Sequence, residues 1–393
     1  MVFIFSGFVK AVDPAGFAIK FTEYFEAFHL GIFAHIALTL AVLVSATEFM
    51  IGLNLIAGLR MKLTAWLLIL FMSFFTVLTF ILAISNPVSD CGCFGDALKL
   101  TNWQTFGKNI ILFVPAIIIF LQRKEIASGF NQAVEWAFVT FNLLLSCTVS
   151  VYCLVHQPVL DFRPYNIGTY IPQKMVIPEG VETDRYETRL IYEKDGRQQE
   201  FSDLDFPWQD TTWKWVETRQ RLVKKGYEPP IHDLSITTLD GEDITGKVLS
   251  DTGYVFLVIA PDLEKASGKG MDKMNSLALK SREYGFPVYC LTASANSQIS
   301  AYMDRYQPAF DVCTTDETTL KTIVRANPGL LLLHRGTILD KWNFRDAPSA
   351  RELSNQLLSA VLLRQHRQFD TILVLALALA VFLVYSLVKG IRH

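Results

Sequence analysis

Hydrophobic and polar positions are distributed very unevenly along this chain. Apolar residues are concentrated in residues 1–155 and again in 370–388, and a polar, charged stretch of about 210 residues lies between them. Runs of 18 or more apolar residues without charge are typical of membrane-spanning helices. The pattern therefore predicts a membrane protein with a large soluble part. It also predicts the lipid bilayer as a partner.

The first apolar region predicts four membrane spans, and the second predicts one more. Their approximate limits are residues 30–59, 63–84, 103–121, 134–155 and 371–388. Residues 1–9 are too few to cross about 30 Å of hydrocarbon, so we expect the outer half of a truncated span or a helix lying on the membrane surface. Residues 13–29 form an amphipathic, aromatic-rich connector suited to the membrane interface.

The loop between residues 84 and 103 carries the most reactive side chains of the membrane part. It reads Asp-Cys-Gly-Cys-Phe-Gly-Asp at positions 90–96. With one glycine between them, Cys91 and Cys93 can close only a small, strained ring, and strained disulfides exchange readily. The loop is therefore a redox candidate. The alternatives are a structural staple or two ordinary free thiols. We predict no metal site, because two thiolates without a nearby histidine leave half of a zinc tetrahedron unfilled.

Glu48 is the second candidate site residue. It lies inside the predicted span 30–59, with Ser45 and Gly52 on the same helical face. Ionisable residues in spans are costly and usually face a bundle interior or a cavity. One interpretation is a proton or ligand site. The other is a structural glutamate that is protonated, hydrogen-bonded or closer to the interface.

Basic residues at the span ends predict the orientation. They form three clusters that share one side of the membrane: Arg60 with Lys62, Arg123 with Lys124, and Lys389 with Arg392. Such clusters are typical of the cytoplasmic face. The thiol loop and residues 156–369 then lie outside, which in a bacterium means the periplasm, where disulfides persist. We expect a multi-pass protein of the bacterial inner membrane with a large periplasmic domain.

The soluble part predicts two kinds of structure. Residues 156–230 are extended, with a hairpin that turns at Asp195-Gly196. Residues 231–365 alternate between strands and helices, which indicates an α/β sandwich. Strands are expected at 254–260, 287–292, 310–313, 330–334 and 337–342, and helices at 271–284, 297–306, 318–325 and 349–364. Net charge is −2 and there is no basic patch, so no nucleic-acid partner is predicted.

Residues 1–155 resemble the DoxX/MauE family of membrane proteins. The matching elements are Phe-Ile-Phe-Ser-Gly-Phe-Val-Lys at 3–10, Asp13-Pro14, the Glu48–Gly52 segment and Cys-Gly-Cys-Phe-Gly at 91–95. The resemblance implies a four-helix bundle in the membrane. It also implies disulfide formation in a periplasmic protein partner and a likeness to disulfide-generating quinone reductases. A quinone is thus the candidate cofactor.

Residues 231–368 resemble a thioredoxin-like domain. Asn327-Pro328 stands before the strand 330–334, where thioredoxins place a cis-proline, and weaker support comes from the segment 240–245. The Cys-x-x-Cys pair expected after the central strand is missing, since residues 260–267 contain no cysteine. Thioredoxin chemistry needs a low-pKa thiol at a helix start. We therefore expect a redox-inactive binding domain, in an arrangement that resembles DoxX-family proteins of Bacteroidetes.

The fold class that we predict combines a DoxX-like membrane bundle of α-helices with a thioredoxin-like α/β domain. The expected parts are the bundle at 1–155, a β-rich segment at 156–230, the thioredoxin-like domain at 231–368 and a C-terminal transmembrane helix at 369–393. The first functional hypothesis is thiol–disulfide redox chemistry or disulfide-linked maturation of a periplasmic partner through Cys91 and Cys93, with Glu48 as a further candidate.

Two hypotheses of other classes stand beside it. One is a non-catalytic scaffold or assembly subunit of a membrane complex, in which the thioredoxin-like domain serves for docking. The other is a transporter or channel built around Glu48. We also expect the thioredoxin-like domain to lie over the external face of the bundle near the thiol loop, with the aromatic segment 208–215 as the contact surface.

Overall fold

The computed structural model describes residues 1–353 apart from 89, 127, 183, 184, 203, 204 and 225. Its contacts divide the chain into two compact units. One contains Met1–Gly168 and the chain from Ser235 onward, and the other is Thr169–Leu234. The predicted span 371–388 and the basic residues after it lie outside the described residues. The domain boundaries proposed from the sequence stay a prediction.

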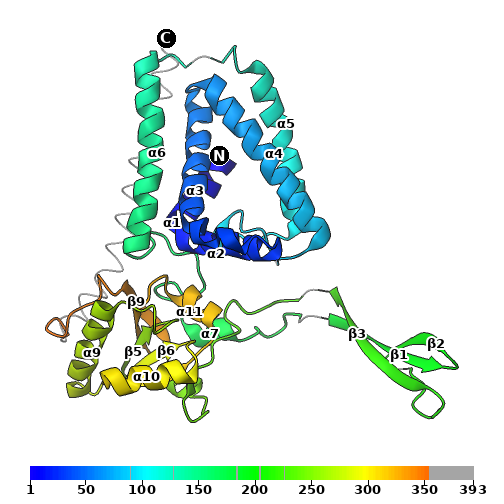
Figure 1. Cartoon of the computed structure of the whole chain (residues 1–393), viewed down its shortest axis with the longest axis vertical. Coiled ribbons are helices and arrows are strands. Elements are labelled where there is room, and N and C mark those ends of the chain that lie inside the picture. Colours follow the sequence, from blue (N-terminus) through cyan, green and yellow to red (C-terminus); the bar gives the residue numbers. More distant parts are fainter. Residues whose placement is uncertain (89, 127, 183–184, 203–204, 225, 354–393) are drawn as a thin grey trace. The chain divides into compact units, whose positions relative to one another are not determined.

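Four helices in the described part of the chain are long and apolar enough to cross a membrane (Figure 1). The first begins with the 3₁₀ helix η1 and continues as α3. The bounds are η1 Gly31–Ile36, α3 Ala37–Ala57, α4 Met61–Ser85, α5 Asn102–Gln122 and α6 Gln132–Val155. They coincide within a few residues with the four spans predicted between residues 30 and 155, so that prediction is confirmed.

The N-terminal segment forms two helices, α1 (Val2–Val12) and α2 (Pro14–Ala27), with a 96° bend between them. Asp13 stands at the bend and accepts a hydrogen bond from the Gly16 amide at 2.9 Å, which caps α2. Pro14 suits the first helical position because its missing N–H would be unpaired there. By length and composition the pair can form one broken span or a re-entrant loop. The interfacial connector expected at 13–29 is thus mostly the helix α2.

Glycines allow α1 to approach α3 very closely. A Cβ atom added at Gly7 would lie 2.5 Å from the backbone nitrogen of Phe49, and one added at Gly52 would lie 2.7 Å from that of Ile4. Small residues commonly permit such close helix contacts in membranes. Both contacts set the register of the two helices, and this register brings Lys10 of α1 next to Glu48 of α3.

The soluble part of the first unit is a mixed α/β domain with a six-stranded sheet in the order β4-β7-β6-β5-β8-β9. Strands β5, β6 and β7 are parallel, while the other three pair antiparallel. The strands are β4 Thr237–Thr238, β5 Tyr254–Ile259, β6 Val288–Thr292, β7 Asp311–Thr314, β8 Gly329–His334 and β9 Thr337–Asn343. The helices are α8 Thr245–Ser250, α9 Gly268–Glu283, α10 Asn296–Tyr306 and α11 Glu317–Ile323.

This domain confirms the predicted α/β sandwich. Its core is built from the apolar side chains of β5 and β8, where Phe256 and Leu332 are fully buried, packed against Met274 and Leu277 of α9. The peptide between Asn327 and Pro328, directly before β8, is cis, as the thioredoxin resemblance leads us to expect. The last predicted helix, 349–364, is not helical at 349–353, and its remainder lies outside the described residues.

The second unit contains a three-stranded antiparallel sheet in the order β2-β1-β3 and a short helix. Its elements are α7 Ile171–Met175, β1 Arg185–Lys194, β2 Arg197–Ser202 and β3 Lys214–Lys224. The predicted hairpin is present, and Asp195 and Gly196 at its turn both have positive φ, which suits a two-residue hairpin loop. Strand β3 was not predicted, because its exposed Trp215 and charged residues lack the alternation typical of a half-buried strand.

The contact between α1 and α3 yields a first testable prediction. Substituting Gly7→Ala should destabilise the protein by about 1–3 kcal/mol, because the Phe49 backbone must move to make room. Gly107→Ala in α5 is the matched control, since a Cβ atom there meets nothing within 4 Å. That variant should be neutral or slightly stabilised. Thermal unfolding in detergent would measure both, and an equal response of the two variants would contradict the close packing.

Candidate functional site

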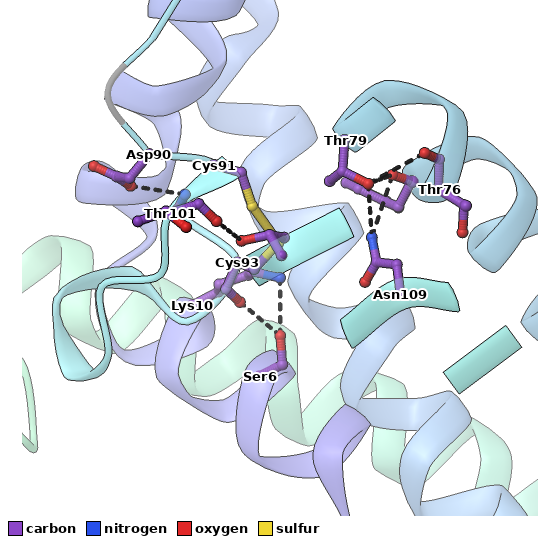
Figure 2. Close-up of a disulfide and its surroundings, with 12 residues drawn as sticks. Ser6, Lys10, Thr76, Thr79, Asp90, Cys91, Cys93, Thr101 and Asn109 are labelled. Carbon is purple, nitrogen blue, oxygen red and sulfur yellow. Dashed lines mark hydrogen bonds between the residues drawn. A yellow bond between two sulfur atoms is a disulfide. The ribbon is translucent and has the colours of Figure 1, made fainter. Parts of the chain in front are cut away.

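Cys91 and Cys93 form a disulfide in the loop between α4 and α5 (Figure 2). Gly92 between them has φ +61°, a conformation that glycine adopts at little cost. A Cβ atom at Gly92 would also lie 2.9 Å from Cγ of Lys20. Cys91 is only 5% exposed, whereas Cys93 is half-buried. The two sulfur-bearing residues are therefore not equivalent, and Cys93 is the more accessible one.

Side chains from α1 and α2 hold the backbone of this loop. The Ser6 hydroxyl donates to the Cys93 carbonyl at 2.7 Å, and the Tyr24 hydroxyl donates to the Cys91 carbonyl. Asp90 accepts a hydrogen bond from the Gly92 amide at 2.9 Å, and its carboxylate pairs with Lys20 of α2 at 3.3 Å. The carbonyls of both cysteines and the turn between them are thus fixed by the first two helices.

Glu48 lies inside the bundle and is paired with Lys10. The Lys10 Nζ is 2.6 Å from the Glu48 Oε2, and the side chains of the two residues are only 4% and 7% exposed. Lys10 also donates to the Ser6 hydroxyl at 3.0 Å. A continuous chain of hydrogen bonds therefore leads from Glu48 through Lys10 and Ser6 to the Cys93 carbonyl (Figure 2 shows its Lys10–Ser6–Cys93 part).

Sequence reasoning selected Glu48 but missed Lys10 and Ser6. Both belong to the segment 3–10 that carries the family resemblance, but no role was expected for either. The signal that could have identified Lys10 is the cost of a buried carboxylate, which calls for a cation nearby. Ser6 stands one helical turn before Lys10, so the two side chains share a face of α1.

An apolar shell covers the buried side of the disulfide. Cys91 packs with Tyr24 and Leu82, and the partly buried side chains of Phe21, Phe28, Leu78 and Val88 surround this group. On the other side of the loop, the Lys108 ammonium lies 4.6 Å from the centre of the Phe94 ring. The shell restricts access to Cys91.

The α/β domain contributes one side chain to the vicinity of the loop. Arg325, two residues before Asn327, contacts Asp13 at the bend between α1 and α2, with Nη2 2.9 Å from Oδ2. The same nitrogen is 3.6 Å from the Asp96 carboxylate, three residues after Cys93 and at the centre of the short 3₁₀ helix η2 (Gly95–Ala97). One guanidinium thus lies between the first two helices and the thiol loop.

The aromatic segment 208–215, which the sequence suggested as the contact surface, belongs to the second unit, and its role in contact stays a prediction. Trp208 and Trp215 belong to the second unit and are 71% and 60% exposed. Two other ionic contacts join the bundle side and the α/β domain within the first unit. His156, just after α6, lies 2.8 Å from Asp346, and Lys341 of β9 pairs with Asp161.

Asp161 is the centre of a buried ionic cluster. The fully buried Arg163 binds it through two nitrogens, Nε at 2.7 Å and Nη2 at 3.0 Å. Lys341 also donates to the carbonyls of Tyr165 at 2.8 Å and Ile323 at 3.2 Å. Burial alone would raise the pKa of Asp161, but Arg163 and Lys341 outweigh it and lower that pKa to about 2. Asp161 is therefore ionised at neutral pH.

The remaining thiols show no sign of reactivity. Cys290 and Cys313 are buried on β6 and β7, and burial raises the pKa of both, that of Cys313 to about 11. Cys147 and Cys153 of α6 are free thiols, half-buried and buried. The thiolate is the nucleophilic form, so a raised pKa makes a thiol less reactive. Among the described cysteines, only Cys91 and Cys93 are paired.

Fold and site together define a multi-pass membrane protein that carries a thioredoxin-like domain and a disulfide loop. Residues 1–122 match the family model for the methylamine utilisation protein MauE. Residues 186–225 match a domain of unknown function, DUF8463. No curated protein matches the chain. The chain thus joins a MauE-like membrane segment to a thioredoxin-like domain, as predicted, while the DoxX part of the resemblance stays a prediction.

Two solved structures are similar to about a third of the chain. A thioredoxin-like protein from Aeropyrum pernix is 16% identical, covering 33% of this chain and 88% of that protein with a TM-score of 0.26. The Xanthomonas campestris bacterioferritin comigratory protein is 12% identical, with 33% and 89% coverage and a TM-score of 0.24. At these values neither likeness indicates an activity.

The buried ionic cluster gives a prediction for stability. Asp161→Asn should destabilise the protein by about 3–5 kcal/mol, because Arg163 and Lys341 would remain buried without their anion. The stabilisation by ionised Asp161 is present above about pH 4 and is lost as the pH falls towards 2. Denaturant unfolding of the purified protein would measure the change. Glu283→Gln, which breaks the exposed pair with Lys280, is the control and should leave the midpoint unchanged. Equal midpoints for both variants would contradict this account.

Proposed function

We propose that this protein carries out thiol–disulfide exchange with a protein partner in the cell envelope, through Cys91 and Cys93. The observation that carries the proposal is the asymmetry of the disulfide. Its backbone is held by Ser6 and Tyr24, Cys91 is covered, and Cys93 is accessible. In such an arrangement a partner can attack the sulfur of Cys93 from outside, and the covered sulfur of Cys91 is the leaving group.

In the proposed reaction, a thiolate of the partner attacks the sulfur of Cys93. The bond between Cys91 and Cys93 breaks, Cys91 leaves as a thiolate, and a mixed disulfide joins Cys93 to the partner. A second partner thiolate then attacks the partner's sulfur in this bond, and Cys93 leaves as a thiolate. The partner is oxidised to a disulfide with the loss of two electrons and two protons. The pair Cys91–Cys93 is reduced and takes up both.

Return to the disulfide requires an acceptor of two electrons and two protons. The resemblance of the membrane part proposes a quinone, which would be released as a quinol. We assign no residue of this chain to hold it. The buried thiols Cys153, Cys290 and Cys313 take no part in the proposed cycle.

The thioredoxin-like domain is proposed to control access to the loop or to present the partner to it. Support comes from Arg325, which contacts both Asp13 and Asp96. A domain without a Cys-x-x-Cys pair cannot supply the exchange chemistry itself. The alternative function is a non-catalytic scaffold in a membrane complex. In that case the ionic contacts of Arg325 would be permanent, and the disulfide would be a structural staple.

Trapping of the mixed disulfide separates these two functions. Cys91→Ser leaves a lone Cys93 thiolate, which can attack the disulfide of an oxidised partner by the reverse of the proposed exchange. No Cys91 thiolate is then present to attack this mixed disulfide, so reductant-sensitive adducts with envelope proteins should accumulate. Cys93→Ser should give several-fold fewer adducts, because Cys91 is covered by the apolar shell. Non-reducing electrophoresis after rapid alkylation would measure both, with the double variant as the baseline. If both single variants give no more adducts than the double variant, the exchange function is rejected and the scaffold function remains.

We also propose that the loop and the α/β domain face the periplasm and that the protein resides in the inner membrane. The basic residues at the ends of α3 and α5 support this orientation. A cysteine introduced at the exposed Glu242 should react with a membrane-impermeant maleimide in intact spheroplasts. A cysteine at the exposed Lys124 is the matched control and should react only after permeabilisation. The reverse labelling pattern would contradict the orientation.

A further inference from the structure

A buried cation lies close to the reactive loop on its inner side. The Lys10 ammonium contacts Glu48 at 2.6 Å and the Ser6 hydroxyl at 3.0 Å, and it stands 5.0 Å from the centre of the Phe17 ring. Because Ser6 donates its only proton to the Cys93 carbonyl, its oxygen is free to accept from Lys10. The Lys10 ammonium is thus linked to the Cys93 carbonyl through the Ser6 side chain.

Stability alone does not require this ion pair. Replacing a buried pair by apolar side chains of similar volume is often neutral or stabilising, so burial of two charges is weak evidence of a purely structural role. Close packing at Gly7 and Gly52 already fixes α1 against α3. The pair adds something that packing does not supply, namely an ammonium group held next to Ser6, which contacts the loop at the Cys93 carbonyl.

Two other cations around the loop are each held between two carboxylates. Lys20 of α2 is held between Glu23 and Asp90, and Arg325 is held between Asp13 and Asp96. The charged groups that surround the loop are Lys10 of α1, Lys20 and Glu23 of α2, Glu48 of α3, Asp90 and Asp96 of the loop, Lys108 of α5, and Arg325 with Asp13. Of these, Lys10 is connected to a cysteine by hydrogen bonds through Ser6.

We propose that Lys10 is a positioning residue for Cys93. The charge of Lys10, relayed through Ser6, stabilises the thiolate that Cys93 becomes when it leaves the mixed disulfide. The inference rests on the proposed exchange function and assigns a role within it. A neighbouring cation favours the thiolate, and a more stable thiolate leaves faster. Glu48 accepts a hydrogen bond from the Lys10 ammonium, which also donates to Ser6, and this gives Glu48 an indirect role.

The test measures the thiolate of Cys93 directly. In the reduced Cys91→Ser protein, the rate of Cys93 alkylation by iodoacetamide would be followed against pH by mass spectrometry. Lys10→Met should move the midpoint of this rate–pH profile upward by about one pH unit, which corresponds to a roughly tenfold loss of alkylation rate at neutral pH. Lys10→Arg should keep the midpoint, because it retains the charge. Ser6→Ala should move it in the same direction as Lys10→Met but less.

Matched controls exclude general effects of substitution. Lys62→Met removes an exposed lysine at the start of α4, and Ser45→Ala removes a buried hydroxyl that bonds only to its own helix. Neither should move the midpoint. Lys108→Met tests a second lysine near the loop, and a shift caused by Lys108→Met but not by Lys10→Met would overturn the proposal.

Failure of this inference can be told apart from failure of the exchange function. Unchanged midpoints in Lys10→Met and Ser6→Ala would overturn the inference even if the Cys91→Ser variant traps a partner. If Lys10→Met does not fold, Ser6→Ala decides alone, and an unchanged midpoint again rejects the role of Lys10. Shifted midpoints without any trapped partner would support the role of Lys10 and reject the exchange function.

Discussion

The close approach of α1 to α3 is the constraint on which the site depends. Two glycines, Gly7 and Gly52, let the helix backbones come together without intervening side chains. This register brings Lys10 next to Glu48 and directs Ser6 at the Cys93 carbonyl. Without it, both charges would be buried without a partner inside an apolar bundle, which is strongly unfavourable. The packing of two helices thus determines the electrostatics of the loop.

Ionic contacts extend this organisation into the soluble part of the first unit. Arg325 lies between Asp13 and Asp96, and Asp161 joins the buried Arg163 to Lys341 of β9. Each contact involves residues that are largely shielded from water, so salt screens it less than it would screen a surface pair. The thioredoxin-like domain, whose own thiols are buried, therefore contributes charge near the loop.

The sequence predicted the parts of this structure that local patterns determine. Long apolar runs identified all four described spans, the alternation after residue 231 identified the α/β domain, and Asn327-Pro328 marked the residue before β8. What it missed depends on contacts between distant residues. Lys10 and Glu48 are 38 positions apart, and Asp13 and Arg325 are 312 apart, so no periodicity connects them. Strand β3 was missed because its exposed Trp215 and charged residues lack the alternation typical of a half-buried strand.

The central claim is that the Cys91–Cys93 disulfide is a working redox pair and not a staple. The most direct measurement is its reduction potential in native membranes, obtained by equilibration in thiol redox buffers followed by differential alkylation and mass spectrometry. Structural disulfides of secreted proteins typically have potentials below about −300 mV, while exchanging ones lie higher. Half-reduction of the pair above about −300 mV is the result that the account predicts. A pair that remains oxidised in buffers below that potential would contradict it.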